Sequence, residues 1–317
     1  MQLQERLRLQ LEIKKGLSMF RKILIANRGE IAVRIIRAAR ELGIETVAVY
    51  STADKEALHT LLADEAVCIG PAKSTESYLN MSAVLSAAVL TGAEAIHPGF
   101  GFLSENSKFA TMCEEVGIKF IGPSAKVMDL MGDKINARKQ MIKAGVPVIP
   151  GSDGEVYTAE EALEIAERIG YPVMLKASAG GGGKGIRKVE KPEDLVAAFE
   201  SASSEAQAAF GNGAMYMERV IYPARHIEVQ ILADQHGHVI HLGERDCSLQ
   251  RNNQKVLEES PSIAIGKTLR NQIGSAAVRA AESVGYENAG TIEFLYDEGK
   301  GEFYLMEKNN RVKVEHP

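Results

Sequence analysis

The chain has 317 residues, of which 45% are hydrophobic, 25% charged and 6% aromatic, and its formal net charge is −5. This length favours about two domains, and the charged fraction is that of a folded chain rather than a disordered one. A mildly acidic chain lacks the basic patch that binds nucleic acid, and no uncharged apolar run approaches the ~20 residues that cross a membrane, so neither partner is expected.

The N-terminus and the cysteines bear on where the protein works. Residues 1–18 place leucines every four positions, which predicts a helical extension, with a partner-binding helix as the alternative. No signal peptide is indicated, because a continuous apolar core and a cleavage site are both missing. Cys68, Cys113 and Cys247 are far apart and not at metal-ligand spacing. They are typical of reduced thiols, so we expect a cytoplasmic protein.

Residues 19–132 are expected to form a Rossmann-like α/β domain. Phe20–Ala26 is a strand candidate, a helix with one apolar face follows and ends at Gly43, and Ile44–Tyr50 is the next strand. Further short apolar runs alternate with helical segments, which predicts a parallel sheet with helices on both faces. The first loop carries only Gly29 instead of a dinucleotide-binding glycine fingerprint, so a structural sheet is favoured. His97, in a glycine-punctuated loop, is more typical of a structural residue than of a catalytic one.

The second domain, residues 133–317, is expected to mix helices and strands and to contain a lid at about 149–221. In the lid, a helix at Thr158–Ile169 precedes strands at Tyr171–Lys176 and Ile186–Val189, and a glycine run separates the strands. This run is not a P-loop, because Gly185 stands where Ser or Thr would be needed. It resembles a hairpin tip whose backbone N–H groups could wrap phosphate oxygens, the alternative being a flexible linker.

The last hairpin predicts a metal site. Strands Thr291–Tyr296 and Phe303–Glu307 flank a glycine-containing turn, and folding them about residue 300 sets Glu293 opposite Glu307. Two carboxylates across a ladder repel each other, and a divalent cation relieves that repulsion. The alternative is an exposed polar face on an edge strand.

These features resemble the biotin carboxylase family of ATP-grasp enzymes from Met19 to Pro317, and most of all its free-standing bacterial members that serve acetyl-CoA carboxylase. The resemblance rests on separated motifs: Ile25–Glu30, His97–Asn106, Leu130–Lys134, Lys176–Ser178 with the glycine run, Glu244–Ser248, Gln254–Lys255, Gly290–Phe294, Arg311 and Val314–Pro317. Family members continue well past this point, so we expect a C-terminally truncated chain. The fold that the resemblance implies is a Rossmann-like N-terminal domain followed by an ATP-grasp domain with a glycine-rich lid.

The resemblance also implies roles for individual residues. It implies that nucleotide contacts come from Lys134, Lys176, Gly182, Gly183, the hinge Glu218, Arg219, Val220 and Ile221, and from His226, with a weaker case for Asn253. It implies that Mg²⁺ or Mn²⁺ is held by Glu293, Glu307 and Asn309. It implies that bicarbonate lies near Lys255, Arg311 and the Val314 backbone, with Arg311 stabilising the biotin enolate and Glu315 acting as general base.

The implied reaction is ATP-dependent carboxylation of biotin by bicarbonate through carboxyphosphate, as the first half-reaction of acetyl-CoA carboxylase in fatty acid synthesis. The implied partners are biotin carboxyl carrier protein, carboxyltransferase subunits and a second copy in a homodimer. Two lysines depart from the family pattern: Lys313 replaces a usual glutamine and Lys308 a usual hydrophobic residue. Two alternatives therefore stay open, a non-catalytic nucleotide-binding fragment and an ATP-grasp ligase with another acceptor.

Overall fold

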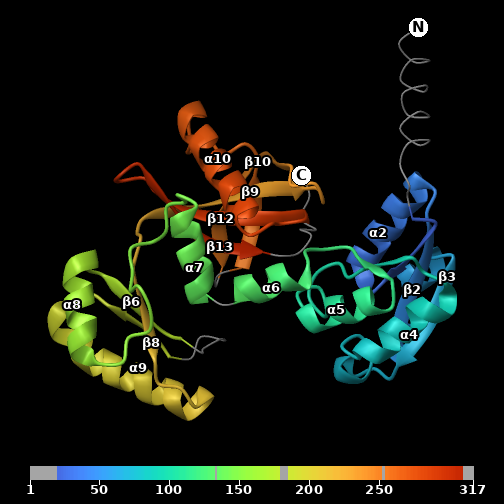
Figure 1. Cartoon of the computed structure of the whole chain (residues 1–317), viewed down its shortest axis with the longest axis horizontal. Helices are drawn as coiled ribbons and strands as arrows, with labels where there is room; N and C mark the ends of the chain where they lie inside the picture. Colours follow the sequence, from blue (N-terminus) through green and yellow to red (C-terminus); the bar gives the residue numbers. More distant parts are fainter. Residues whose placement is uncertain (1–19, 133, 179–184, 252–253, 310–317) are drawn as a thin grey trace, which may run out of the picture. The chain divides into compact units, whose positions relative to one another are not determined.

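The computed structural model describes residues 20–132, 134–178, 185–251 and 254–309, without the side chains of 134, 135 and 307–309. Its contacts divide these residues into two compact units (Figure 1). The first comprises residues 20–129 with Glu287–Gly290, and the second comprises Leu130–Tyr286 with Thr291–Asn309. No helix of the described ranges is long and apolar enough to span a membrane.

The first unit is built on a five-stranded parallel sheet of order β3-β2-β1-β4-β5. Its strands are β1 (Lys22–Ile25), β2 (Glu45–Ser51), β3 (Glu65–Gly70), β4 (Ala95–His97) and β5 (Lys119–Phe120). Its helices are α2 (Gly29–Leu42), η1 (Thr52–Asp54), α3 (Leu58–Leu62), η2 (Ser74–Glu76), α4 (Met81–Thr91), α5 (Ser107–Glu115) and, running on into the second unit, α6 (Ala125–Gly132). The parallel order confirms the predicted Rossmann-like class.

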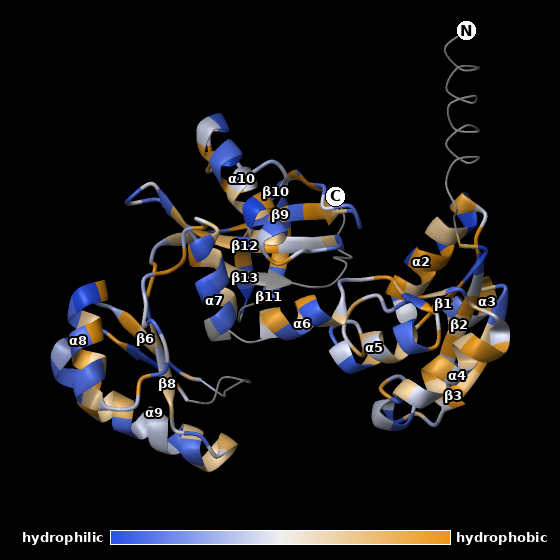
Figure 2. Cartoon of the chain, in the orientation of Figure 1, coloured by the Kyte–Doolittle hydropathy of each residue, from blue (hydrophilic) through white to orange (hydrophobic). Residues whose placement is uncertain are grey.

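Alternating residues of β1 serve two separate cores. Ile23 and Ile25 pack with buried residues of α2, whereas Leu24 and Ala26 pack with buried residues of α4 and α5. Figure 2 shows that α4 is largely hydrophobic, as expected for a helix that lies over a sheet. Because neighbouring side chains of a strand point to opposite faces, both faces of this sheet are covered by helices, as predicted.

The loop that follows β4 is held by one buried side chain. Asn27 donates from Nδ2 to the carbonyls of Pro98 and Phe100, each at 2.7 Å. His97 accepts the backbone N–H of Gly99 at Nδ1, at 3.1 Å. Burial lowers the pKa of His97 to about 4, so the imidazole is neutral at pH 7. These contacts support the structural role expected for His97.

The second unit contains a five-stranded sheet of order β11-β10-β9-β12-β13. Its strands are β9 (Ala224–Ala233), β10 (Val239–Arg251), β11 (Gln254–Glu259), β12 (Asn288–Asp297) and β13 (Glu302–Asn309), accompanied by helices α7 (Lys134–Lys143) and α10 (Lys267–Ser283). Strand β11 was not predicted, because most of its residues are exposed and show no hydrophobic alternation. At the edge strand β13, Leu305 forms a bridge with Val148, so the expectation of an unpaired edge is wrong at that residue.

A second, three-stranded sheet of order β7-β6-β8 forms the region expected to be a lid. It contains α8 (Ala159–Ile169), β6 (Val173–Ala177), β7 (Ile186–Val189), η3 (Pro192–Asp194), α9 (Leu195–Phe210) and β8 (Met215–Arg219). Thr158 caps α8 by accepting the Glu161 N–H, which explains why the predicted helix begins there. Val173 and Leu175 enter the core under α8 and α9, so Met174 and Lys176 lie on the opposite face.

Candidate active site

The β12–β13 hairpin places two acidic residues directly across the ladder. Glu293 pairs with Glu307, which confirms the register predicted from the sequence. A register shift between Glu293 and Phe294 then sets Phe294 against Leu305, one residue away from a straight hairpin. The pairing nearest the turn was therefore predicted one residue out, whereas the pairing at the acidic end was right.

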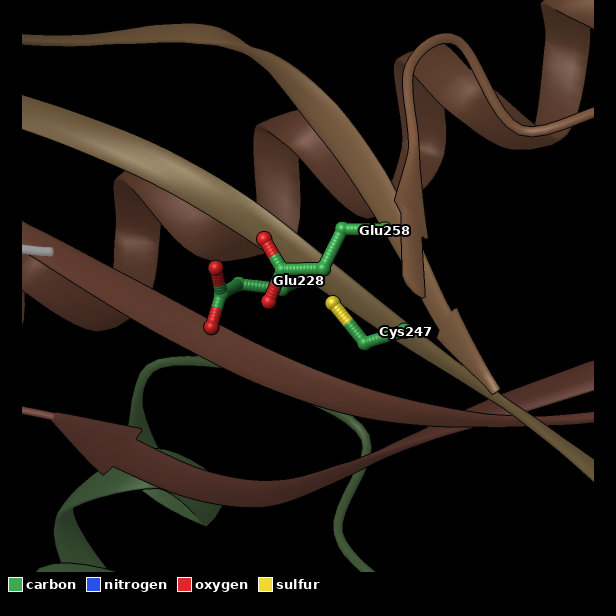
Figure 3. A group of neighbouring side chains, drawn as sticks. All are labelled: Glu228, Cys247 and Glu258. Atoms are coloured by element: carbon green, nitrogen blue, oxygen red, sulfur yellow. The ribbon is translucent and has the colours of Figure 1, made fainter. Parts of the chain in front are cut away.

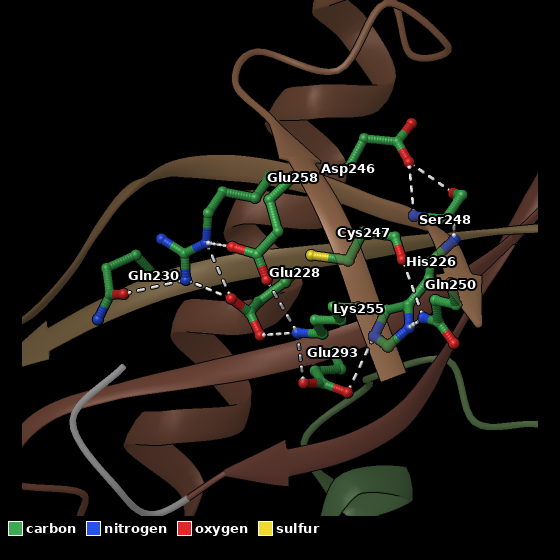
Figure 4. Close-up of polar contacts among 11 residues, drawn as sticks. His226, Glu228, Gln230, Asp246, Cys247, Ser248, Gln250, Lys255, Glu258 and Glu293 are labelled. Carbon is green, nitrogen blue, oxygen red and sulfur yellow. Dashed lines mark hydrogen bonds and ion pairs between the residues drawn. The ribbon is translucent and has the colours of Figure 1, made fainter. Parts of the chain in front are cut away.

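Glu293 is a buried carboxylate with two basic partners (Figure 4). It is 4% exposed, with His226 Nε2 at 2.9 Å from Oε2 and Lys255 Nζ at 3.2 Å from Oε1. Burial opposes ionisation, but the hydrogen bond and charge of His226 and the charge of Lys255 hold the pKa of Glu293 well below its usual range. The carboxylate is therefore ionised at neutral pH and suited to a divalent cation.

His226 on β9 is fixed by residues of β10. Gln250 donates from Nε2 to His226 Nδ1 at 2.7 Å, and the His226 N–H donates to Ser248 Oγ at 3.0 Å. Because Nδ1 accepts, the neutral ring carries its hydrogen on Nε2, facing Glu293. Sequence reasoning did not identify Gln250, although it lies five residues before Lys255.

Lys255 reaches from β11 into a row of acidic side chains. Its Nζ lies 2.7 Å from Glu228 Oε2, 3.2 Å from Glu293 Oε1 and 3.7 Å from Glu258 Oε1. Glu228 also accepts from Nε of Arg245 at 2.9 Å. Glu228, Arg245 and Glu258 were missed as site residues. A detectable signal was the spacing of His226 and Glu228, which puts both on one face of β9.

A second group of possible metal ligands lies beside Lys255 (Figure 3). The ligand atoms of Glu228, Cys247 and Glu258 all lie within 4.8 Å of one another. Arg245 and Lys255 already engage both carboxylates, and burial raises the pKa of Cys247 to about 12. The thiol is therefore protonated at neutral pH. Cations of the chain itself balance this group, and Glu293 with Glu307 fits a metal better.

On the lid sheet, Lys176 and Glu218 form an ion pair. Lys176 Nζ lies 2.5 Å from Glu218 Oε2, and the two side chains are 42% and 17% exposed. They come from adjacent strands and share the face turned away from the lid core. This pair brings together two of the residues expected at a nucleotide.

The hinge that follows Glu218 is anchored within the protein. The N–H groups of Arg219 and Val220 donate to the carbonyls of Pro150 and Pro172, each at 2.8 Å. The Arg219 guanidinium donates to the Tyr304 hydroxyl at 2.9 Å, and Ile221 packs with Ile149 and Tyr304. These two N–H groups therefore serve the fold, so an adenine at this hinge would use other backbone atoms.

The remaining expected site residues lie outside the described part of the chain. These are Gly182, Gly183, Asn253, Arg311, Val314 and Glu315. The side chains of Lys134, Glu307 and Asn309 are likewise outside it. Within the described residues, the structure brings His226, Lys255 and Glu293 into one network and Lys176 and Glu218 into another contact.

Comparison with known proteins identifies the class. Residues 133–317 match the ATP-binding domain of the carbamoyl-phosphate synthase L chain, and residues 19–128 match the biotin carboxylase N-terminal domain. Together with the three sheets, these matches define an ATP-grasp protein.

Individual relatives narrow the class to a family. Biotin carboxylase 1 of Bacillus subtilis is 58% identical over 299 residues, which is 94% of this chain and 66% of that protein. Biotin carboxylase of Nostoc is 59% identical over 298 residues, again covering 94% and 66%. The crystal structure of a biotin carboxylase complex with β,γ-ATP from Campylobacter jejuni matches with a TM-score of 0.86 and 54% identity, covering 94% of this chain and 67% of that one. The chain therefore belongs to the biotin carboxylase family, and it spans about two thirds of its relatives' length.

Proposed function

We propose that this chain carries the ATP-dependent step in which bicarbonate carboxylates biotin on a carrier protein. The observation that carries the proposal is Glu293, a buried, ionised carboxylate that pairs with Glu307 and is bonded to both His226 and Lys255. The names of the relatives support the same activity. A solved relative from Hydrogenobacter thermophilus, with a TM-score of 0.84 and 53% identity, is a complex with MgADP and bicarbonate.

The proposed chemistry suits a site that positions charges. Bicarbonate is a poor electrophile, and its phosphorylation by ATP would give carboxyphosphate, which releases CO₂ and phosphate beside the ureido nitrogen of biotin. Lys255 would lie between the γ-phosphate and bicarbonate, Arg311 and the Val314 backbone would hold bicarbonate, and Glu315 would accept its proton. Arg311 would also stabilise the enolate of biotin. Positioning and charge stabilisation would supply most of the rate enhancement.

The described residues fit a divalent cation. Glu293 offers an ionised oxygen, and its partner across the ladder is a second glutamate. We propose that Glu293, Glu307 and Asn309 hold Mg²⁺ or Mn²⁺. When bound, the cation supplies charge stabilisation to the β- and γ-phosphates.

The nucleotide would be held by residues of the lid and the neighbouring strands. Lys176 can reach it only by giving up part of its contact with Glu218. The other proposed contacts are Lys134, Gly182, Gly183, the hinge residues, His226 and Asn253. We also propose the domain division expected from the sequence: an extension at 1–18, a first domain at 19–132 and an ATP-grasp domain at 133–317 with its lid at about 149–221.

The finer assignment is also a proposal. We propose that the chain serves acetyl-CoA carboxylase in fatty acid synthesis, with a biotin carboxyl carrier protein, carboxyltransferase subunits and a second copy as partners. A pyruvate carboxylase component of Methanothermobacter thermautotrophicus is 56% identical over 299 residues, so the final acceptor remains open to test. The buried, unpaired thiols of Cys113 and Cys247 suit a reducing cytoplasm.

The test is phosphate release from Mg-ATP, measured with and without bicarbonate and free biotin. Release that requires both is expected, and Glu293→Gln should abolish it. Glu282→Gln, on the exposed end of α10, is the matched control and should keep it. A folded sample in which release depends on neither compound would contradict the proposal and indicate a nucleotide-binding fragment.

A further inference from the structure

Strand β10 carries two buried arginine–glutamate pairs on its opposite faces. Glu244 accepts from Nε of Arg270 on α10 at 2.7 Å, and both sit on the helix-covered face of the sheet. The next residue, Arg245, bonds Glu228 of β9 on the other face, where Lys255 and Glu293 also lie (Figure 4). The two pairs are chemically alike, but only one of them touches the candidate site.

The Arg245 guanidinium is tied down on several sides. It is 7% exposed, and it donates from Nε and from a terminal nitrogen to the same oxygen of Glu228, Oε1. It also donates to Gln230 Oε1 at 3.2 Å and lies 3.7 Å from Glu258 Oε2. Such a geometry fixes the orientation of the Glu228 carboxylate rather than merely balancing its charge.

This arrangement divides the oxygens of Glu228 between two cations. Arg245 holds Oε1, and Lys255 lies 2.7 Å from Oε2. Glu228 is 0% exposed, so water cannot replace a lost cation. Without Arg245, the buried carboxylate would pull on Lys255 alone. The ammonium of Lys255 would then move toward Glu228 and away from Glu293.

We propose that Arg245 is a positioning residue: by holding Glu228 from the far side, it keeps Lys255 shared between Glu228 and Glu293, where Lys255 can meet a substrate. This inference rests on the proposed function, since the substrate of Lys255 is the bicarbonate and γ-phosphate proposed above. Arg245 itself touches Glu228, Gln230 and Glu258 and acts only through them.

The kinetic test compares Arg245→Met with Arg270→Met, which breaks the similar pair on the other face. In the bicarbonate- and biotin-dependent assay, R245M should lower kcat at least tenfold and change the KM for ATP less than threefold. R270M should lose a similar amount of thermal stability and keep kcat within twofold. Arg245→Lys retains the charge with a shorter reach, so it should recover part of the loss in kcat. Equal losses of kcat in R245M and R270M, or no loss in R245M, would overturn the proposal.

A structural readout separates this proposal from the proposed function. If the wild-type protein shows no bicarbonate-dependent release, the proposed function fails while the position of Lys255 can still be measured. Crystal structures of R245M, or of R245K if R245M does not fold, should show Nζ of Lys255 more than 4 Å from the Glu293 carboxylate. An unchanged Lys255–Glu293 contact in the variant would overturn the role of Arg245 whatever the activity.

Discussion

Lys255 and Glu293 meet at 3.2 Å although they come from β11 and β12, strands that are separated in the sheet by β10 and β9. The contact exists because both side chains extend across the same face, over Glu228 of β9. A lysine that spans this face links the strand of the candidate metal ligand to the opposite edge of the sheet. Changes at either end should therefore affect the other.

The first prediction concerns Glu293→Gln. The amide keeps the shape but removes the charge that would bind a cation, so affinity for Mg-ADP should fall about tenfold or more. Calorimetric titration of ADP with and without Mg²⁺ measures this effect. In EDTA, the wild-type protein and the variant should bind ADP with similar affinity. A variant that keeps the full Mg²⁺ dependence would show that the metal binds elsewhere.

The second prediction separates the two members of the lid ion pair. Lys176→Met should weaken ADP binding about tenfold, as expected for a lost charge-assisted contact of at least ~1.5 kcal/mol. Glu218→Gln should tighten binding about two- to fivefold, because Lys176 no longer has to leave a carboxylate; a partly exposed pair contributes only ~0.5–1 kcal/mol.

Fluorescence titration with a labelled nucleotide measures both variants. Lys188→Met is the control, since that lysine pairs with Glu190 on β7 rather than with Glu218. If Glu218→Gln weakens binding as much as Lys176→Met does, the carboxylate contacts the nucleotide itself, and competition for Lys176 is not its main role.

The third prediction concerns Gly185, which follows the glycine run. Its φ is +66°, and an added Cβ would lie 2.8 Å from the Cβ of Ala177. Gly185→Ala should therefore cost about 1–3 kcal/mol from backbone strain and overpacking. Urea unfolding gives the stability, and the KM for ATP reports on the lid. Gly154→Ala, where no atom lies within 4 Å of the added Cβ, should leave both unchanged.

How far the sequence predicts the candidate site is clearest at β9 and β10. A straight hairpin closed at Asp234–His238 would set Glu228 opposite Glu244. The register instead shifts between His241 and Glu244, and Arg245 pairs with Glu228. Gly243, at φ +101°, lies in that shift. Bulges depend on packing that is remote in sequence, so residue spacing alone could not place Arg245 beside Glu228.

By contrast, local signals were enough for most of the fold. Gly43 ends α2 in the left-handed conformation, and Thr158 begins α8, both as the sequence indicates. The pairing of Glu293 with Glu307 followed from counting outward from the glycine-containing turn. Strand β11 was missed because it lies at the sheet edge with mostly exposed side chains, where the period-two pattern is lost.

The last prediction is a pH dependence of stability that comes from His97. Its pKa in the folded protein is about 4, against 6.5 ordinarily, because burial disfavours the charged ring. The unfolded chain binds a proton below pH 6.5 while the folded one does not, so stability is full above pH 6.5 and falls as the pH drops towards 4. The whole window amounts to about 3 kcal/mol, at about 1.4 kcal/mol per pH unit.

Urea unfolding of the wild-type chain and His97→Asn at pH 7.5 and 5.5 measures this contribution. Asparagine can still accept the Gly99 N–H but does not titrate, so the wild-type protein should lose about 1 kcal/mol more than the variant between the two pH values. His59 is also buried with a lowered pKa, but it is present in both proteins and cancels in the comparison. His236→Asn, at an exposed turn, should follow the wild-type slope. Equal slopes for wild-type and His97→Asn would mean that the folded protein accommodates a charged His97, and that the loop after β4 opens to water.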